Sequence, residues 1–533
     1  MIRSSPLTQL GKRAAKELVA KTHGSASQEA AEYMDDEPAA VLDVIDLIVA
    51  ESRKKKPNEN LVSAYAFMLA HGLDGVRMQI EGGLGAGERI KAAAVDKLLR
   101  LGRGGAVDPA VLMVILSQFS GAKLDMGDDL RAMLADCIQD MPPPGEHGVT
   151  RDGREVERHF AEVVSAAKGD LFILQKQMFE RADVFPPDSR ASMALAMLQS
   201  DQPLIREASI GWLLDRNSLV RTSVAEAIAN LNPPARISGS MLRRMIALRN
   251  WLPAVDRPAL DAAIRTCRQR EVACASWPSG EVVKALATGI DGGGAQSLFL
   301  VAKEKRKYAI VGLLLKHDVG IRDAWVNHGL SRSNVDDFLE DLPLDADFFH
   351  TSIDYLQAST AHLLATGVAT GTLPPFMFFD LAETIGVSDL NPAAMEVERL
   401  VADLCEQVDD GILKPRAVTR VIKTIDHWHA EFAFMETWFE NDDLVRKQVA
   451  EAGVGAAGEP AFILNTVLPQ RRRRWAEMIA WTAYTLKQDG DEPYWEEFAV
   501  TARELLSDRD IADFAIMKAI AETTSAALRD ADG

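Results

Sequence analysis

The chain has 533 residues, more than one ordinary hydrophobic core holds, and this length predicts two to four domains or one elongated array of repeats. Apolar residues make up 47% of the chain, which excludes a protein that is disordered throughout. Its 78 acidic residues outnumber 59 basic residues, and the net charge of −19 disfavours nucleic-acid binding over a broad surface because it repels phosphate backbones.

Residues 1–24 are basic and amphipathic, without an apolar run long enough for a signal peptide. A transit peptide shares this pattern and stays open as an alternative. The four cysteines are widely spaced and match no zinc-binding or redox pattern. We therefore expect a cytoplasmic chain without disulfides, whose thiols are buried as small apolar side chains. The cysteines are Cys137, Cys267, Cys274 and Cys405.

Apolar residues recur every three or four positions through most of the chain, which places them on one face of a helix. Two early examples are the stripes that begin at Val41 and at Leu61. Clusters of glycine and proline separate the helices, as in the predicted turn GGLGAG at 82–87. The run Met141–Gly148 (MPPPGEHG) is the clearest predicted linker.

The stretch 188–231 repeats one pattern three times. Arg190, Arg206 and Arg221 each precede a pair of apolar residues by seven and eight positions, and their spacing of fifteen or sixteen residues fits one short helix and a tight connection. We predict three successive helices with equivalent apolar faces, in which Leu213 and Ile228 are buried. Each arginine is expected to stay exposed while its stem covers a neighbour.

Two of these helix starts resemble the opening of a helix in HEAT-like repeat proteins, D-x-P-x-[VI]-R. Asp201–Arg206 (DQPLIR) fits this pattern, with Asp201 as the expected cap and Pro203 in the first turn. Asn217–Arg221 (NSLVR) fits it in part, without the aspartate and the proline. The resemblance implies stacked helical hairpins with concave, protein-binding surfaces. Ordinary helix packing without a repeat is the alternative.

Two segments of the second half differ from simple amphipathic helices. Gln296–Lys316 contains two apolar, β-prone runs and predicts a hairpin that turns at Lys305 and Arg306, although short apolar runs also fit a helix. Tyr355–Phe379 is free of charge and long enough to span a bilayer, but two prolines near its end stop a helix. We expect a buried helix, a turn and a second helix there, and no membrane span.

The best candidate for a metal site is the run DHWHAEF, which contains His427, His429 and Glu431. On a helix His427 and Glu431 share a face, whereas His429 points elsewhere, and zinc sites on helices place two strong ligands four residues apart. Trp428 and Phe432 begin an apolar stripe, which favours a packing helix with a His427–Glu431 surface pair. We therefore expect neither a metal nor a cofactor.

Three basic clusters stand out against the acidic background, and each is a candidate contact for an anion or a partner. The last lies at a predicted helix start, where positive charge opposes the helix dipole and needs acidic neighbours, solvent or an anionic partner. We favour solvated or internally paired charges over nucleic-acid binding. The clusters are Arg53–Lys56; Lys303, Lys305, Arg306 and Lys307; and Arg471, Arg472, Arg473 and Arg474.

Together these patterns predict an all-α fold, an irregular, solenoid-like array of helical hairpins with one small β-hairpin near 296–316. The predicted regions are an N-terminal helical part (1–140), a HEAT-like repeat part (149–290) and a C-terminal helical part that opens with the hairpin (291–533). The expected function is that of a cytoplasmic scaffold or protein–protein interaction module. Two alternatives stay open: a nucleic-acid-associated protein that uses Arg471–Arg474, and an enzyme whose site is assembled from distant helices.

Overall fold

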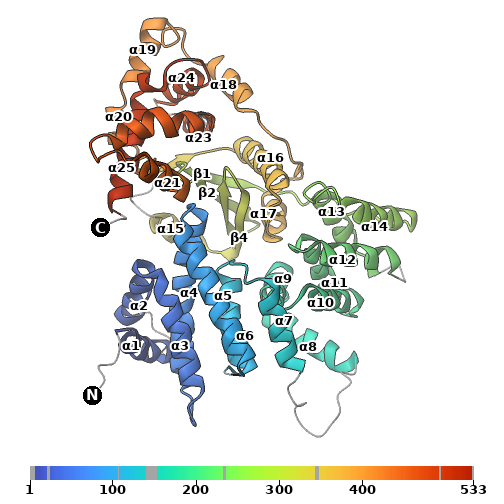
Figure 1. Ribbon diagram of the computed structural model, residues 1–533. Coiled ribbons are helices and arrows are strands. Elements are labelled where there is room, and N and C mark those ends of the chain that lie inside the picture. The colour runs from blue at the N-terminus through green and yellow to red at the C-terminus, as the bar shows by residue number, and fades with distance from the viewer. Residues whose placement is uncertain are drawn as a thin grey trace, which may run out of the picture. The chain divides into compact units, whose positions relative to one another are not determined.

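The computed structural model is mainly helical, with one antiparallel sheet in the second half of the chain (Figure 1). The chain divides into two compact units, Met1–Ser209 and Ile210–Gly533. The finer division into three regions stays a prediction, and its linker, Met141–Gly148, lies outside the described residues. The structure describes residues 6–20, 24–105, 107–139, 153–231, 236–342, 347–490 and 494–530.

The described part of the first unit consists of helices. They are α1 (Pro6–Ala20), α2 (Ser25–Asp36), α3 (Val41–Ser52), α4 (Glu59–Glu81), α5 (Gly85–Arg103), α6 (Pro109–Gly121), α7 (Asp128–Gln139), α8 (Gly153–Ala166), α9 (Leu171–Ala182), α10 (Pro187–Gln199) and α11 (Pro203–Ala208).

The longest of these helices, α4, packs against α1, α2, α3, α5 and α6. The predicted stripes on α3 and α4 are confirmed, because Val41, Ile45, Leu61 and Met68 are all buried in one core. Residues 82–84 form the expected connection, in which Gly83 has a positive φ of 75°, and residues 85–87 already belong to α5.

The repeated arginines of 188–231 bind the turns that precede their own helices. Helix and turn ends leave backbone carbonyls without partners, and a guanidinium that folds back supplies one. This contact explains why a basic residue recurs near the start of α10, α11 and α12 (Ser218–Asn230). Each arginine donates a hydrogen bond from its Nη1 atom to a backbone carbonyl. Arg190 donates to Phe185 (2.8 Å), Arg206 to Ser200 (2.7 Å) and Arg221 to Asp215 (2.5 Å).

The expectation that these arginines stay exposed is therefore wrong. Arg190 and Arg221 are buried and Arg206 is half-buried, because the guanidinium groups turn inward to the backbone. Arg221 also pairs with Asp256, whose side chain is fully buried. The predicted burial of Leu213 and Ile228 is confirmed.

The helix starts agree with the sequence patterns in part. Asn217 caps α12 by accepting from the Leu219 amide. Pro203 is the first residue of α11, but the N-cap residue is Gln202 and not Asp201. The HEAT-like resemblance as a whole stays a prediction.

The second unit contains a five-stranded antiparallel sheet of order β4-β3-β2-β1-β5. The predicted hairpin is confirmed, since β2 and β3 pair from Ala295↔Lys316 to Glu304↔Lys307 around the turn at Lys305 and Arg306. The sequence predicted an all-α fold apart from this hairpin, and the structure adds the three strands β1, β4 and β5. The strands are β1 (Val282–Thr288), β2 (Ala295–Glu304), β3 (Lys307–Lys316), β4 (Gly320–Leu330) and β5 (Phe348–His350).

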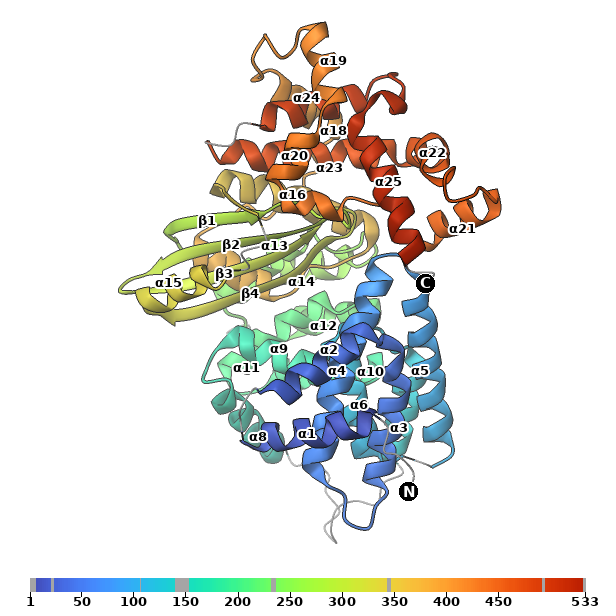
Figure 2. The same cartoon turned by 90° about the vertical axis from the view of Figure 1, so that its left-hand side faces the viewer.

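Helices cover the two faces of this sheet unequally (Figure 2). The inner face carries Leu298, Leu300, Val311 and Leu313, all buried. It faces α16 (Ile353–Thr370) and α23 (Leu468–Gln488), which hydrogen-bond to Gln296 through Tyr355 and Thr485. α17 (Met377–Ile385) contacts β3 and β4. The outer face packs against one short helix, α15 (Arg332–Glu340).

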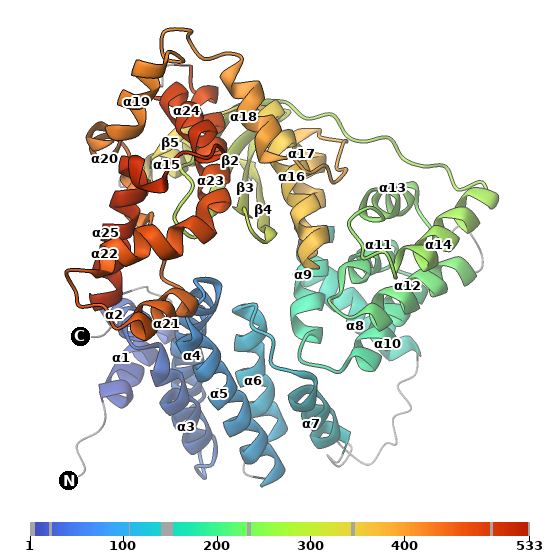
Figure 3. The same ribbon diagram turned by 45° about the horizontal axis from the view of Figure 1, so that its top comes forward.

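The remaining helices of this unit form two groups. α12 packs against α14 (Arg257–Gln269), which contacts α13 (Gly239–Leu248). The C-terminal group gathers around α23, with α24 (Trp495–Leu505) and α18 (Val397–Cys405) beside it (Figure 3). The other helices of that group are α19 (Pro415–Lys423), α20 (Asp426–Glu431), α21 (Asp443–Ala452), α22 (Glu459–Phe462) and α25 (Ala515–Asp530).

The charge-free run Tyr355–Phe379 contains α16, a turn and the start of α17, as predicted. Its helices pack inside the protein, with Tyr355 and Phe379 fully buried. Across the described residues, no helix is both long and apolar enough to cross a membrane.

The four cysteines are free thiols. Cys267 is buried, as expected of a small apolar side chain, and burial raises its pKa. The expectation of burial is wrong for Cys274, which is exposed in the segment after α14.

The buried pair of Arg221 and Asp256 gives a direct stability test. Asp256→Asn leaves the buried guanidinium without a counter-charge, and we expect the free energy of unfolding to fall by about 3–5 kcal/mol. The matched control is Asp261→Asn, because Asp261 lies in α14, which begins directly after Asp256, and its pair with Arg249 is one-third exposed. That change should cost less than about 1 kcal/mol. Urea unfolding of both variants measures the difference, and equal losses would contradict the assignment.

Candidate functional site

The four consecutive arginines near the start of α23 are bound within the protein. Nη2 of Arg471 lies 2.5 Å from a carboxylate oxygen of Asp442. Arg472 donates to the backbone carbonyls of Leu505 and, at 2.7 Å, Arg509. Both guanidinium groups are thus occupied by partners from neighbouring helices and turns.

The other two arginines are paired as well. Arg473 makes a bidentate pair with Glu398, which holds the pKa of that carboxyl below its usual range. Arg474 donates to the Gly292 carbonyl at 2.7 Å and lies 3.5 Å from the buried carboxylate of Glu440. The acidic neighbours that this helix start needs are present, which supports the prediction of an internally paired cluster.

The basic residues of the β2–β3 hairpin have a different environment. Lys305, Arg306 and Lys307 are exposed at the turn, where Lys305 has a φ of 55°. Lys303 is also exposed and lies 3.3 Å from Glu281. The tip of the sheet is therefore a small basic surface on an acidic protein.

The predicted histidine cluster does not converge. His427 Nε2 lies 2.7 Å from Glu497, which also accepts from the Trp428 indole, so the expected pairing with Glu431 is wrong. His429 and Glu431 are exposed. Across the described residues no group of three or more His, Cys, Asp or Glu could hold a metal ion.

The helix that carries this cluster is shorter than the predicted apolar stripe. α20 ends at Glu431, and a 3₁₀ turn, Ala433–Thr437, follows. Trp428, Phe432 and Met435 are nevertheless buried, because the chain folds back onto the same core. The Trp428 ring stacks on Phe498 with centroids 3.9 Å apart.

The outer face of the sheet carries a cluster of four aromatic rings, which we call the outer aromatic patch: Phe299, Trp325, Phe338 and Phe348. Phe299 lies 6.3, 5.9 and 6.1 Å from the other three ring centroids, in that order. All four rings are half-buried. The patch is therefore a continuous apolar surface that keeps contact with solvent.

A glycine positions one of these rings. A Cβ atom at Gly312 would lie 2.1 Å from the indole of Trp325, so only glycine lets this ring lie flat across β3. Farther along the same strand and face, Leu314 is 36% exposed. Toward the hairpin tip, α15 covers Val301 and Ile310 through Val335.

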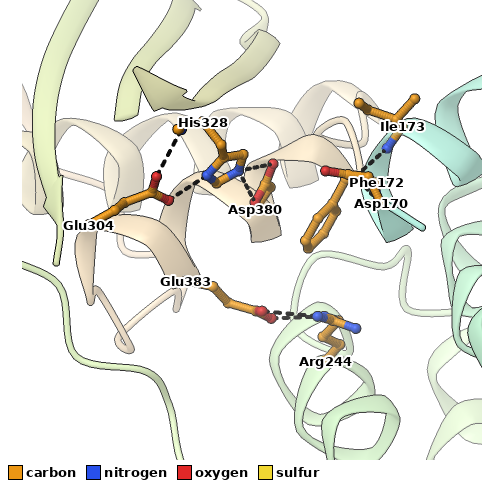
Figure 4. Close-up of polar contacts among 9 residues, drawn as sticks. Asp170, Phe172, Ile173, Arg244, Glu304, His328, Asp380 and Glu383 are labelled. Carbon is orange, nitrogen blue, oxygen red and sulfur yellow. Dashed lines mark hydrogen bonds and ion pairs between the residues drawn. The ribbon is translucent and has the colours of Figure 1, made fainter. Parts of the chain in front are cut away.

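α17 lies between the sheet and the α13 helix, and its acidic side chains bind both. The ring of His328 on β4 lies between two carboxylates: Nδ1 is 2.6 Å from Glu304 and Nε2 is 3.1 Å from Asp380 of α17 (Figure 4). Hydrogen bonds to Asp380 and, less strongly, to Glu304 raise the pKa of His328 to about 9. His328 is therefore a cation at neutral pH.

One turn later, Glu383 of α17 binds α13. Arg244 donates to its two carboxylate oxygens at 2.8 and 2.9 Å (Figure 4). Arg243 lies 2.7 Å from the same carboxylate and stacks on Trp277, 4.9 Å from the ring centroid. Two arginines thus hold one carboxylate in a mostly buried position.

Sequence patterns did not identify the outer aromatic patch or the α17 contacts. Glu304 lies inside the basic run KEKRK, but its partner His328 is 24 positions farther along the chain. Asp380, the second partner of His328, is another 52 positions away. The alternation of side chains between the two faces of β2 could have identified the outer face, because Phe299 and Val301 lie on the face opposite to Leu298 and Leu300. The pairing of distant carboxylates and cations left no local pattern.

Parts of the chain are similar to domains of a known family. Residues 186–271, which contain α10 to α14, match the Y4lR second domain, and residues 398–529 match the Y4lR C-terminal helical domain. A relative from Sinorhizobium fredii (strain NBRC 101917 / NGR234), "Uncharacterized protein y4lR", is 25% identical over 370 residues, which cover 68% of this chain and 70% of the relative. No solved structure matches the chain.

The raised pKa of His328 predicts how stability changes with pH. A histidine whose pKa rises from 6.5 to about 9 on folding contributes stability that is complete below pH 6.5 and is lost as the pH rises through about 9. Because the side chain is 36% exposed, solvent reduces the size of the effect. We expect the melting temperature of the protein to fall more between about pH 6.5 and about pH 9.5 than that of His328→Gln. Parallel curves for the two proteins would contradict this assignment.

Proposed function

We propose that the chain is a soluble cytoplasmic scaffold whose protein-binding surface is the outer face of its sheet. The observation that carries this proposal is the outer aromatic patch, Phe299, Trp325, Phe338 and Phe348, which is clustered and half-exposed. Aromatic residues are enriched at protein interfaces, where their large apolar areas supply binding energy.

The chemistry of the partner follows from the charge beside this patch. Lys303, Lys305, Arg306 and Lys307 project from the tip of the same sheet, and Arg332 of α15 is 74% exposed over the Tyr308 ring. An acidic protein segment with apolar side chains matches both parts of the surface. Attraction to the basic tip would speed its encounter, and the aromatic rings would hold it.

The alternatives from the sequence receive less support. The arginines at 471–474 have partners within the protein, so binding phosphate would require breaking these contacts. Aromatic rings beside basic residues also suit single-stranded nucleic acid, which makes nucleic acid an outcome that the test must separate. The outer face supplies no reactive group, so it does not support the enzyme alternative. The HEAT-like resemblance of 188–231 stays part of the proposal.

The test compares charge changes at two exposed basic turns. Lys305→Glu with Arg306→Glu reverses the hairpin tip, whereas Lys55→Glu with Lys56→Glu makes the same change at an exposed turn in the first unit. Phe348→Ser removes one ring of the patch. We expect partners captured by the tagged full-length protein from nuclease-treated native lysate to lose about tenfold in affinity with the tip variant, or ~1.4 kcal/mol, and to be lost with Phe348→Ser.

The control variant should retain these partners, and elevated salt should weaken their binding. Retention of all partners by the tip and Phe348→Ser variants would contradict the proposed surface. Capture that disappears on nuclease treatment, together with direct binding of labelled single-stranded oligonucleotides, would instead establish the nucleic-acid alternative.

A further inference from the structure

Three nitrogen-containing rings come together beneath the inner face of the sheet, apart from the proposed docking surface. His317 directly follows β3, His362 lies on α16, and Trp481 lies on α23. Each is more than nine-tenths buried. The His317 and His362 centroids lie 5.5 and 5.0 Å from that of Trp481 and 6.4 Å from each other. We call this group the ring cluster.

The polar atoms of the ring cluster are unusual because they are buried without partners. Both nitrogens of His317, Nε2 of His362 and Nε1 of Trp481 make no hydrogen bond to any residue that the structure describes. A buried polar group without a partner costs about 1–3 kcal/mol, and native proteins almost always supply one. Four such atoms on three neighbouring rings point to a partner from outside the chain, and one small ligand can satisfy three of them.

The donors and acceptors of the cluster can be assigned in turn. The Met395 amide donates to His362 Nδ1 at 3.1 Å, so a neutral His362 ring carries its proton on Nε2. Glu477 approaches that Nε2 at 3.4 Å, outside hydrogen-bond geometry. The Trp481 indole only donates. Burial lowers the pKa of His317 to about 3, so that ring is neutral and offers one donor and one acceptor.

We propose that the ring cluster binds a small carboxylate together with one proton. The carboxylate oxygens accept from Trp481 Nε1–H and His362 Nε2–H. The proton lies between the ligand and His317: either the carboxyl O–H donates to the acceptor nitrogen of His317, or the imidazolium donates to the carboxylate. Atoms and charge are equal in both forms, and neither leaves an unpaired charge in a buried site.

The surrounding charges favour uptake in this neutral form. Glu477 on α23 faces His362. Lys316 and Asp291 lie near each other beside the loop 291–294, and the Gly294 carbonyl accepts from the His317 amide at 2.9 Å. Arg474 also acts on Asp291, and Asp318 directly follows His317. The three acidic side chains Glu477, Asp291 and Asp318 thus outnumber the two cations Lys316 and Arg474, which disfavours a bare anion and favours a ligand that brings a proton.

Fluorine NMR of the full-length protein tests this inference. Labelling with 5-fluorotryptophan gives one resonance for each of the nine tryptophans, and Trp481→Phe identifies the relevant one. Sodium acetate is titrated at constant ionic strength with sodium chloride. We expect the Trp481 resonance to shift saturably at millimolar acetate, and the apparent affinity to fall about tenfold for each pH unit between about 5.5 and 7.5 because one proton is taken up.

The matched control is Trp428→Phe, because the Trp428 indole already donates to Glu497 at 3.0 Å. Acetate should raise the melting temperature of the wild type and of this control but not of Trp481→Phe. His317→Leu supplies a second variant, which should lose both the acetate response and its pH dependence. A Trp481 resonance that does not respond to acetate, or an equal thermal response in all variants, would overturn the proposal and leave buried water as the partner of these nitrogens.

Discussion

The contact of Glu383 with Arg243 and Arg244 organises the second unit. It joins α13 to α17, and α17 is joined in turn to β4 through Asp380 and His328. The segment before β1 also packs closely against the end of α17, since a Cβ atom at Gly280 would lie 2.3 Å from the Ile385 carbonyl carbon. Because unpaired buried charges are costly, these ionic contacts favour one position of α17 over others.

The two proposed binding sites follow from the way helices cover this sheet. α16 and α23 cover its inner face, and burying their polar side chains there brings together His317, His362 and Trp481. The outer face receives only α15, so Phe299 and Trp325 keep contact with solvent. One asymmetry of packing thus yields a buried polar cluster and an exposed apolar patch.

The sequence predicted elements whose signals are local and missed those that depend on distant partners. The helical spacing of apolar residues predicted the burial of Leu213 and Ile228. Two apolar runs predicted the β2–β3 hairpin. β4 carries polar residues such as Asn327 and His328, and β5 has three residues, so neither shows a clear strand pattern. The pairing of Arg221 with Asp256 and of Arg474 with the Gly292 carbonyl was hidden because these partners are brought close only by folding.

The most direct measurement of the central claim is hydrogen exchange on the full-length protein and on Glu383→Gln. If α17 connects the sheet to α13 through this carboxylate, the amides of α13, α17 and β4 should lose protection together, while those of α24 stay unchanged. Faster exchange confined to α17, with α13 and β4 as protected as in the wild type, would contradict the account.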